Sequence, residues 1–273
     1  MERIQKAIEK AREQRDLITQ QGSTAAVSDR YGVTTSVRER WNEVTEFEPD
    51  SKWLARNNIS TEKRSDISVP MDMLRTKILQ VMRQNNWNRL AITSPNSGAG
   101  KTTISANLAF SLARQTEQRV CLIEMDMKRP NIATVLGMKE HTPQFSYVLE
   151  GKASHKNHLL RIGDNLLVGA NTGPVKRSSE LLQGEAVGDI LTDIEHAYDA
   201  TIMIFDMPPM LVTDDMMAFG PHCDCALLVA AAESTTVDEI DVCERELAES
   251  TNILGVTLNK CRYMPRELGY SYY

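Results

Sequence analysis

The chain has 273 residues, a formal net charge of −6 at pH 7 and a pI of about 5.5. This length suits one large α/β domain with extensions or two small domains, and the acidic balance argues against nucleic acid as a partner. No apolar run is long enough to span a bilayer and no signal peptide opens the chain. We therefore expect a cytoplasmic protein that a partner can recruit to the inner membrane. The five cysteines form no regular framework, which predicts reduced thiols.

The N-terminal quarter of the chain carries only weak structural signals. Residues 1–20 are rich in charge with a thin apolar stripe, which fits a helix that docks on a partner or another subunit, or a solvated helix without a partner. We expect a linker and irregular extension over 21–66, because its first part is rich in small polar residues. Trp41 and Trp53 stand in its second part as isolated anchors.

From residue 67 to residue 265, apolar runs alternate with amphipathic ones. The predicted strands are 90–93, 119–123, 165–168, 201–205, 226–230 and 253–258, and the predicted helices are 69–84, 103–115, 178–198 and 236–250. Continuous apolar strands between helices indicate a mostly parallel sheet with helices on both faces, an α/β fold. We expect the last segment, 266–273, to form a mobile tail, and it holds several tyrosines.

The most informative stretch is Ser94–Thr103, which lies between a predicted strand and a predicted helix and contains Gly-Ala-Gly-Lys-Thr-Thr. This context predicts the phosphate-binding loop of a P-loop NTPase, although Pro95 stands where a first glycine is usual. Lys101 is expected to reach the phosphates and Thr102 to bind Mg²⁺. The alternative is a strand-to-helix turn that uses glycines for tight packing. The predicted nucleotide-binding residues are Ser97, Gly98, Ala99, Gly100, Lys101, Thr102 and Thr103.

Carboxylates follow two other predicted strands. Glu124 and Asp126 come after the apolar run that ends at Ile123, and Asp206 follows the run that ends at Phe205. In a parallel sheet these positions share the edge that holds the P-loop. Asp206 is expected to bind Mg²⁺ with Thr102, and we expect Glu124 and Asp126 to point the same way and to complete the metal shell or position the nucleophile. Each carboxylate could instead cap a helix or form a loop ion pair.

These motifs together resemble those of the bacterial tyrosine kinases, in the branch associated with exopolysaccharide loci and within the MinD/ParA-like P-loop ATPases. The residues that carry the resemblance are Ser94–Thr103, Ile123–Pro130, Phe205–Pro209 with Thr213–Asp215, Ser178–Leu182, Leu258–Lys260 and the opening Glu2–Arg12. The resemblance covers residues 69–265 well and implies a P-loop kinase domain over 67–265.

The resemblance implies an ATP-dependent protein tyrosine autokinase that regulates exopolysaccharide chain length or export, with ATP and Mg²⁺. It implies catalytic roles for Lys101, Glu124, Asp126 and Asp206 and an adenine contact for Asn259. The implied acceptors are Tyr270, Tyr272 and Tyr273 of the tail. It also implies a membrane chain-length determinant or co-polymerase as partner, self-association and a cognate tyrosine phosphatase.

Two other functions fit the same loop. A MinD/ParA-like ATPase switch usually carries a second lysine at the place of Asn96, and its absence favours the kinase. A regulatory scaffold that binds nucleotide without catalysis is suggested by Glu124, which stands where the kinases usually have Asp, and by the short tyrosine cluster. Asp72 stands where the kinases' oligomerisation helix usually has Arg, so ring assembly does not follow from the resemblance.

Overall fold

The computed structural model describes residues 35–61, 67–138 and 142–262. The docking helix predicted at 1–20 and the acceptor tyrosines predicted in the tail lie outside these residues. No helix in the described part is long and apolar enough to cross a membrane.

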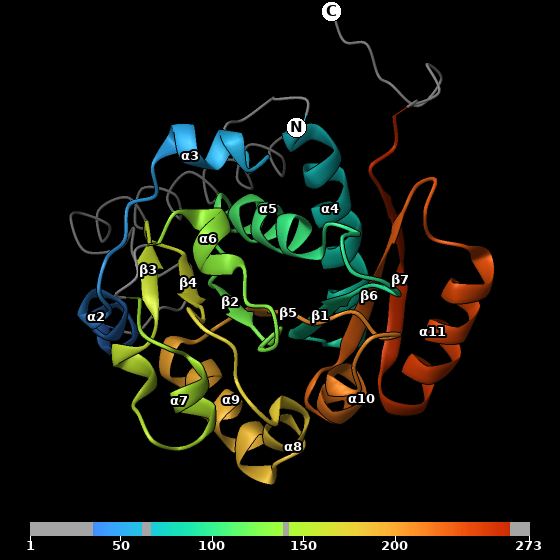
Figure 1. Ribbon diagram of the computed structural model, residues 1–273. Helices are drawn as coiled ribbons and strands as arrows, with labels where there is room; N and C mark the ends of the chain where they lie inside the picture. The colour runs from blue at the N-terminus through green and yellow to red at the C-terminus, as the bar shows by residue number, and fades with distance from the viewer. Residues whose placement is uncertain (1–34, 62–66, 139–141, 263–273) are drawn as a thin grey trace, which may run out of the picture.

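A seven-stranded sheet in the order β3-β4-β2-β5-β1-β6-β7 forms the centre of the molecule (Figure 1). Its strands are β1 (Arg89–Thr93), β2 (Val120–Glu124), β3 (Leu160–Ile162), β4 (Leu166–Gly169), β5 (Ile202–Asp206), β6 (Cys225–Ala231) and β7 (Asn252–Asn259). All neighbouring strands are parallel except β3 and β4, which are antiparallel. The six strands predicted from apolar runs are confirmed, and β3 is an additional short edge strand.

Helices cover both faces of the sheet, as predicted (Figure 1). On one face lie α4 (Ser68–Asn85), α5 (Lys101–Ala113) and α6 (Ile132–Leu136). On the other lie α7 (Ser146–Leu149), α8 (Ser178–Leu182), α9 (Glu185–Tyr198), α10 (Asp215–Phe219) and α11 (Val237–Ser250). Two short 3-10 turns, η2 (His155–Asn157) and η3 (Gly220–His222), lie between these elements. Every residue of β2, β5 and β6 is buried, because both faces of these central strands are covered.

One predicted helix is divided in the structure. The apolar periodicity over 178–198 continues through Gly184, but the backbone of this residue is extended and separates α8 from α9. Glycine carries a high conformational cost inside a helix, so it is a natural place for the break. The break sets α8 at an angle that brings its first residue, Ser178, against α10.

The segment expected to be irregular contains two helices, α2 (Thr35–Glu43) and α3 (Ser51–Arg56). Trp41 of α2 donates from Nε1 to the carbonyl of Tyr198 at 2.9 Å, and Trp53 of α3 donates from Nε1 to the carbonyl of Thr134 at 2.9 Å. Between the two helices the chain forms a parallel bridge to β3. The segment therefore crosses the β3 edge of the sheet and contacts helices on both faces.

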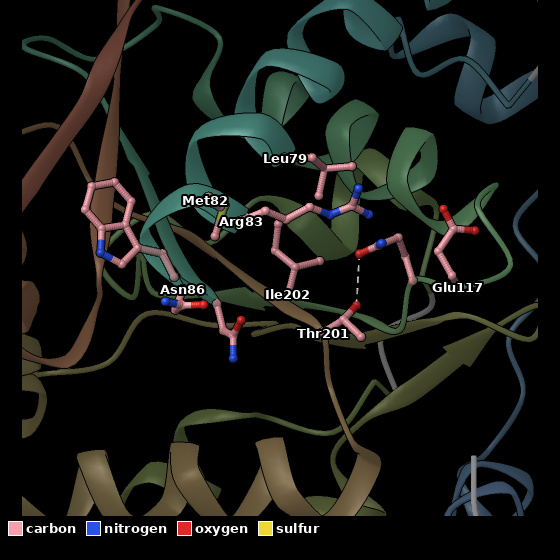
Figure 2. A pocket seen from close by; sticks show the side chains of 10 residues that line it. Leu79, Met82, Arg83, Asn86, Glu117, Thr201 and Ile202 are labelled. Carbon is pink, nitrogen blue, oxygen red and sulfur yellow. Dashed lines mark hydrogen bonds between the residues drawn. The ribbon is translucent and has the colours of Figure 1, made fainter. Parts of the chain in front are cut away.

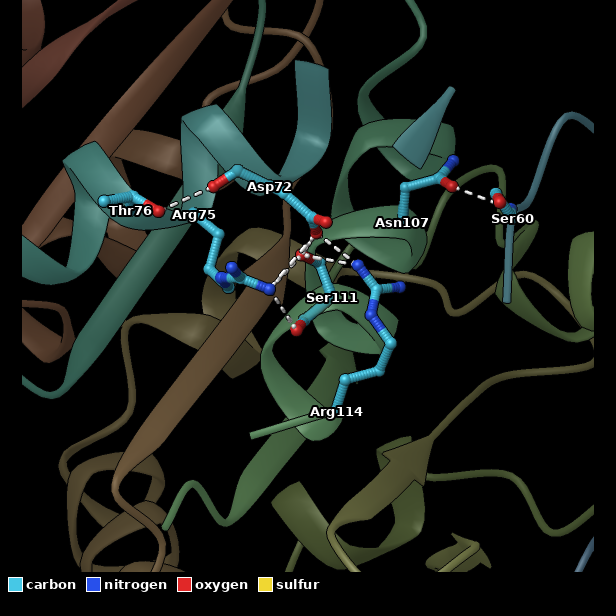
Figure 3. Close-up of polar contacts among 7 residues, drawn as sticks. All are labelled: Ser60, Asp72, Arg75, Thr76, Asn107, Ser111 and Arg114. Carbon is cyan, nitrogen blue, oxygen red and sulfur yellow. Dashed lines mark hydrogen bonds and ion pairs between the residues drawn. The ribbon is translucent and has the colours of Figure 1, made fainter. Parts of the chain in front are cut away.

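A polar cluster joins α4 to the P-loop helix α5 (Figure 3). The carboxylate of Asp72 accepts from Arg75 at 3.1 Å and from the Ser111 hydroxyl at 2.5 Å, and it also pairs with Arg114. Figure 3 shows these side chains converging between the two helices. The cluster therefore joins α4 to the C-terminal end of α5.

Candidate active site

The P-loop is held in place by two glycines with positive φ and by a contact from β7. Gly98 has φ +81° and Gly100 has φ +93°, a region that favours glycine. A Cβ at Gly100 would lie 2.3 Å from Nδ2 of Asn259, which donates to the carbonyl of Ala99 at 2.8 Å. Asn259, predicted as an adenine contact, thus lies against the P-loop itself.

Asp206 ends β5 beside the first turn of α5. One carboxylate oxygen accepts from the Thr102 hydroxyl at 2.7 Å, and the other accepts from the Ser105 hydroxyl at 3.0 Å. Burial raises the pKa of Asp206 to about 6, against the lowering effect of Thr102 and Lys101. The structure therefore brings together the two side chains predicted to bind Mg²⁺.

Lys101 begins α5 and is 7 % exposed. Burial lowers the pKa of this lysine, while the nearby carboxylates of Asp206 and Asp126 raise it. The two carboxylates offset the cost of burying the Lys101 ammonium even without a ligand. The lysine can therefore stay charged in the site, as phosphate binding requires.

Asp126 lies two residues after the end of β2, in a turn of the chain. The N–H groups of Met125 and Asp126 both donate to the carbonyl of Asp206 at 2.9 Å, so this turn is fixed against β5. The Asp126 carboxylate accepts from the N–H of Arg129 at 3.0 Å. Burial raises the pKa of Asp126, and the nearby Lys101 lowers it.

Glu124 takes a different direction from Asp126. Its carboxylate is 0 % exposed and accepts from the N–H groups of Ile132 and Asn171, each at 2.7 Å, and also from the N–H of Asn131. Burial raises the pKa of Glu124 to about 8, although these hydrogen bonds lower it. The prediction that Glu124 and Asp126 point the same way assumed a strand that continues through both residues. It is not met, because β2 ends at Glu124 and the chain turns there.

A cleft of about 870 Å³ opens at the carboxyl edge of the sheet. Its lining residues are Ser97, Gly98, Gly100, Lys101, Thr102, Thr103, Asp126, Lys128, Arg129, Pro130, Asn131, Pro208, Pro209, Val212, Thr213 and Lys260. Six of the seven predicted nucleotide-binding residues line this cleft, together with the predicted catalytic residue Asp126, and the seventh, Ala99, is buried.

Three basic residues of this lining were not predicted as site residues. Lys128 and Arg129 follow Asp126 in the same motif, and Lys260 follows Asn259. The position of Lys128 and Arg129 beside Asp126 was the available signal, because it is close enough to face phosphate, although isolated basic pairs are solvated by default.

A second cavity, of about 480 Å³, lies at the opposite edge of the sheet (Figure 2). It is formed by the end of α4, the turn before β2 and the start of β5, where Thr201 donates to Gln118 at 3.0 Å. It contains none of the predicted site residues.

The side chains at the cleft fit Mg²⁺ held largely by a nucleotide. The described residues contain no group of three or more His, Cys, Asp or Glu side chains that could hold a metal ion by themselves. A hydroxyl from Thr102 and a carboxylate from Asp206, together with phosphate oxygens, match the oxygen ligands that Mg²⁺ prefers.

A model of the ParA family, described as the NUBPL iron-transfer P-loop NTPases, matches residues 85–267. The chain belongs to this P-loop NTPase family. It is 29 % identical over 223 residues to tyrosine-protein kinase YwqD of Bacillus subtilis, covering 81 % of this chain and 92 % of that one. It is 30 % identical over 215 residues to the putative tyrosine-protein kinase AmsA of Erwinia amylovora, covering 78 % of this chain and only 28 % of that one. The chain thus spans little more than a quarter of the longer relative.

Solved structures agree with the sequence relatives. The kinase domain of the Escherichia coli tyrosine kinase ETK has a TM-score of 0.66 and 25 % identity, and the match covers 88 % of this chain and 99 % of that one. The septum site-determining protein MinD of Pyrococcus horikoshii has a TM-score of 0.54 at 20 % identity, which shows the shared fold. The resemblance to the bacterial tyrosine kinases, predicted from the motifs, is confirmed. Proteins of the P-loop NTPase family bind nucleotides, and the P-loop of this chain lines the cleft.

Proposed function

We propose that the chain is an ATP-dependent protein tyrosine autokinase. The observation that carries the proposal is the cleft lined by the P-loop, Lys101 and Asp126, together with the 2.7 Å hydrogen bond from the hydroxyl of Thr102 in this lining to the buried carboxylate of Asp206. The relatives named as tyrosine-protein kinases support the same activity.

The proposed roles follow from the contacts. The P-loop backbone and Lys101 hold the phosphates of ATP, and Asn259 supports the loop from β7 on the side assigned to the adenine. Mg²⁺, held by Thr102 and Asp206, supplies charge neutralisation at the phosphates.

Asp126 is the proposed group that receives the tyrosine proton. The tyrosine oxygen attacks the terminal phosphorus, the bond from that phosphorus to the bridging oxygen breaks, and ADP leaves. The phenolic proton passes to Asp126, whose carboxylate has a raised pKa and therefore accepts a proton more readily than an exposed aspartate. Glu124 contributes by holding the backbone at Asn131 and Ile132, which follow the turn that carries Asp126.

The proposed acceptors are Tyr270, Tyr272 and Tyr273, and the proposed process is control of exopolysaccharide chain length or export. The Klebsiella pneumoniae relative is named as a putative tyrosine-protein kinase in the cps region, which supports a role at a polysaccharide locus. We propose a membrane chain-length determinant as partner, because the longer relatives contain much sequence that this chain does not match. Self-association would then bring one tail to a neighbouring cleft, and a tyrosine phosphatase would reverse the modification.

The experiment that tests this function follows the terminal phosphate. The full chain is incubated with Mg²⁺ and ATP labelled on that phosphate, beside Lys101→Met and the control Lys176→Met, which changes an exposed lysine outside the cleft. Label on tyrosine in the wild type and the control, lost in Lys101→Met, supports the kinase. Label released only as inorganic phosphate identifies an ATPase switch, and binding without either identifies a scaffold.

A further inference from the structure

Lys128 enters the cleft with its ammonium held by a buried carboxylate. Its Nζ lies 3.0 Å from Oδ2 of Asp215, and its side chain is 41 % exposed. Asp215 is 1 % exposed, and its other oxygen accepts from the Ser178 hydroxyl at 2.5 Å. Among the described residues, Oδ2 has no hydrogen-bond partner and Lys128 is its ion-pair partner.

Three separate elements meet at this pair. Lys128 belongs to the loop after β2, Ser178 begins α8 and Asp215 begins α10. The burial of a carboxylate is costly unless a cation compensates it, so Asp215 favours an ordered Lys128 ammonium over one that samples solvent. The ion pair therefore holds the Lys128 ammonium in a fixed position at the cleft. A cation that is already in position stabilises a negative charge developing nearby more strongly than a mobile one does.

Charges of both signs act on Asp126 at the cleft. Beyond the effect of burial, the pKa of its carboxylate is lowered by Lys101 and Arg129 and raised by Asp215. The P-loop, Lys101 and Lys128 line the same cleft, and Lys128 is the cation of this lining that a buried carboxylate holds in place, so a phosphate chain held by the P-loop has an ordered ammonium within the same cleft.

We propose that Lys128 contacts the terminal phosphate of ATP and that Asp215 is the positioning residue for this contact. This inference depends on one part of the proposed function, namely that ATP binds in the cleft. A cation on the transferred group would supplement Lys101, and phosphoryl transfer depends mainly on such positioning and charge stabilisation.

The test compares ADP with a β,γ-imido analogue of ATP, both with Mg²⁺, by equilibrium binding to the full chain. Lys128→Met should weaken binding of the analogue about tenfold, the loss expected for a charge-assisted hydrogen bond, while ADP binding changes less than about twofold. Asp215→Asn should lower the ratio of analogue affinity to ADP affinity in the same direction by a smaller factor. Lys128→Arg should retain the wild-type ratio. Lys156→Met is the matched control, since Lys156 is 47 % exposed and pairs with Glu43 at 2.8 Å, outside the cleft lining.

Equal losses for ADP and the analogue, or lower thermal stability with an unchanged ratio, would show that the pair only fastens α10 and would overturn the proposal. A change in the KM for an acceptor peptide without any change in the nucleotide ratio would overturn it as well. Because binding is measured without transfer, a chain that discriminates the analogue through Lys128 but never labels tyrosine refutes the kinase and supports the Lys128 contact.

Discussion

The hydroxyl of Thr102 donates a 2.7 Å hydrogen bond to the carboxylate of Asp206, and this bond joins the first turn of the P-loop helix to the end of β5. β5 is the direct neighbour of β1, the strand that leads into the P-loop. The sheet order therefore places together two side chains that are far apart in the sequence, and their oxygens lie within hydrogen-bonding distance beneath the cleft that Thr102 lines.

Magnesium-dependent nucleotide binding should weaken in acid because of Asp206. Mg²⁺ binds the ionised carboxylate, and burial raises the pKa of Asp206 to about 6, so protons compete with the metal below that pH. We expect about tenfold weaker Mg²⁺ enhancement of nucleotide affinity one pH unit below this pKa. The measurement is nucleotide titration with and without Mg²⁺ across this range, and Asp206→Asn should abolish the enhancement at every pH. A flat profile for the wild type would exclude Asp206 as the metal ligand.

The raised pKa of Asp206 also makes the free energy of unfolding of the metal-free protein depend on pH. The pKa of Asp206 is higher in the folded chain than in the unfolded one, so its contribution to the free energy of unfolding is fully present below the unfolded pKa, about 4, and is lost as pH rises through about 6. Asp206→Asn should remove this contribution to the pH dependence, which urea unfolding at several pH values would show.

Glu124→Gln should destabilise the fold. The carboxylate accepts from the N–H groups of Asn131, Ile132 and Asn171, and a glutamine amide would place an NH₂ donor against at least one of them. A buried group left without its partner costs about 1–3 kcal/mol in the free energy of unfolding. Urea unfolding above pH 8, where Glu124 with its pKa of about 8 is ionised, should show this loss, with Glu249→Gln on the exposed side of α11 staying within about 0.5 kcal/mol of wild type. Equal stabilities of the two variants would contradict the role assigned to Glu124.

Asp72 and Arg114 should be energetically coupled. They pair across the α4–α5 contact, where Asp72 also accepts from Ser111 at 2.5 Å. Asp72→Ala and Arg114→Ala should each lower the free energy of unfolding, and the double variant should lose less than the sum of the two by about 0.5–1 kcal/mol, since Asp72 is partly exposed. The measurement is a double-mutant cycle by urea unfolding. Strict additivity would mean that the cluster in Figure 3 does not fasten α5 to α4.

The sequence predicted best what depends on local pattern. The P-loop and the strand that ends at Asp206 are contiguous motifs, and the parallel sheet follows from apolar runs that alternate with helices. The direction of Glu124 was not predictable, because it depends on N–H groups supplied by the β2–α6 loop and by the end of β4. The pairing of Lys128 with Asp215 likewise depends on how α8 and α10 pack.

The N-terminal helices show a second limit. α2 and α3 are too short for a clear periodic pattern, and each is fastened by one tryptophan whose Nε1 donates to a backbone carbonyl of the main body. β3 has three residues and pairs antiparallel at the sheet edge, so its apolar signal is weak. Such elements owe their structure to tertiary contacts more than to intrinsic propensity.

The central claim is that this cleft transfers phosphate to the tyrosines of the chain's own tail. The most direct measurement is intact-mass spectrometry of the full chain before and after incubation with Mg²⁺ and ATP, with peptide mapping of the C-terminus. We predict added phosphate on Tyr270, Tyr272 or Tyr273, removed by a tyrosine phosphatase and missing in Lys101→Met. A tail that stays unmodified, with ATP bound or hydrolysed and a cytoplasmic segment of the membrane partner present, would contradict the claim.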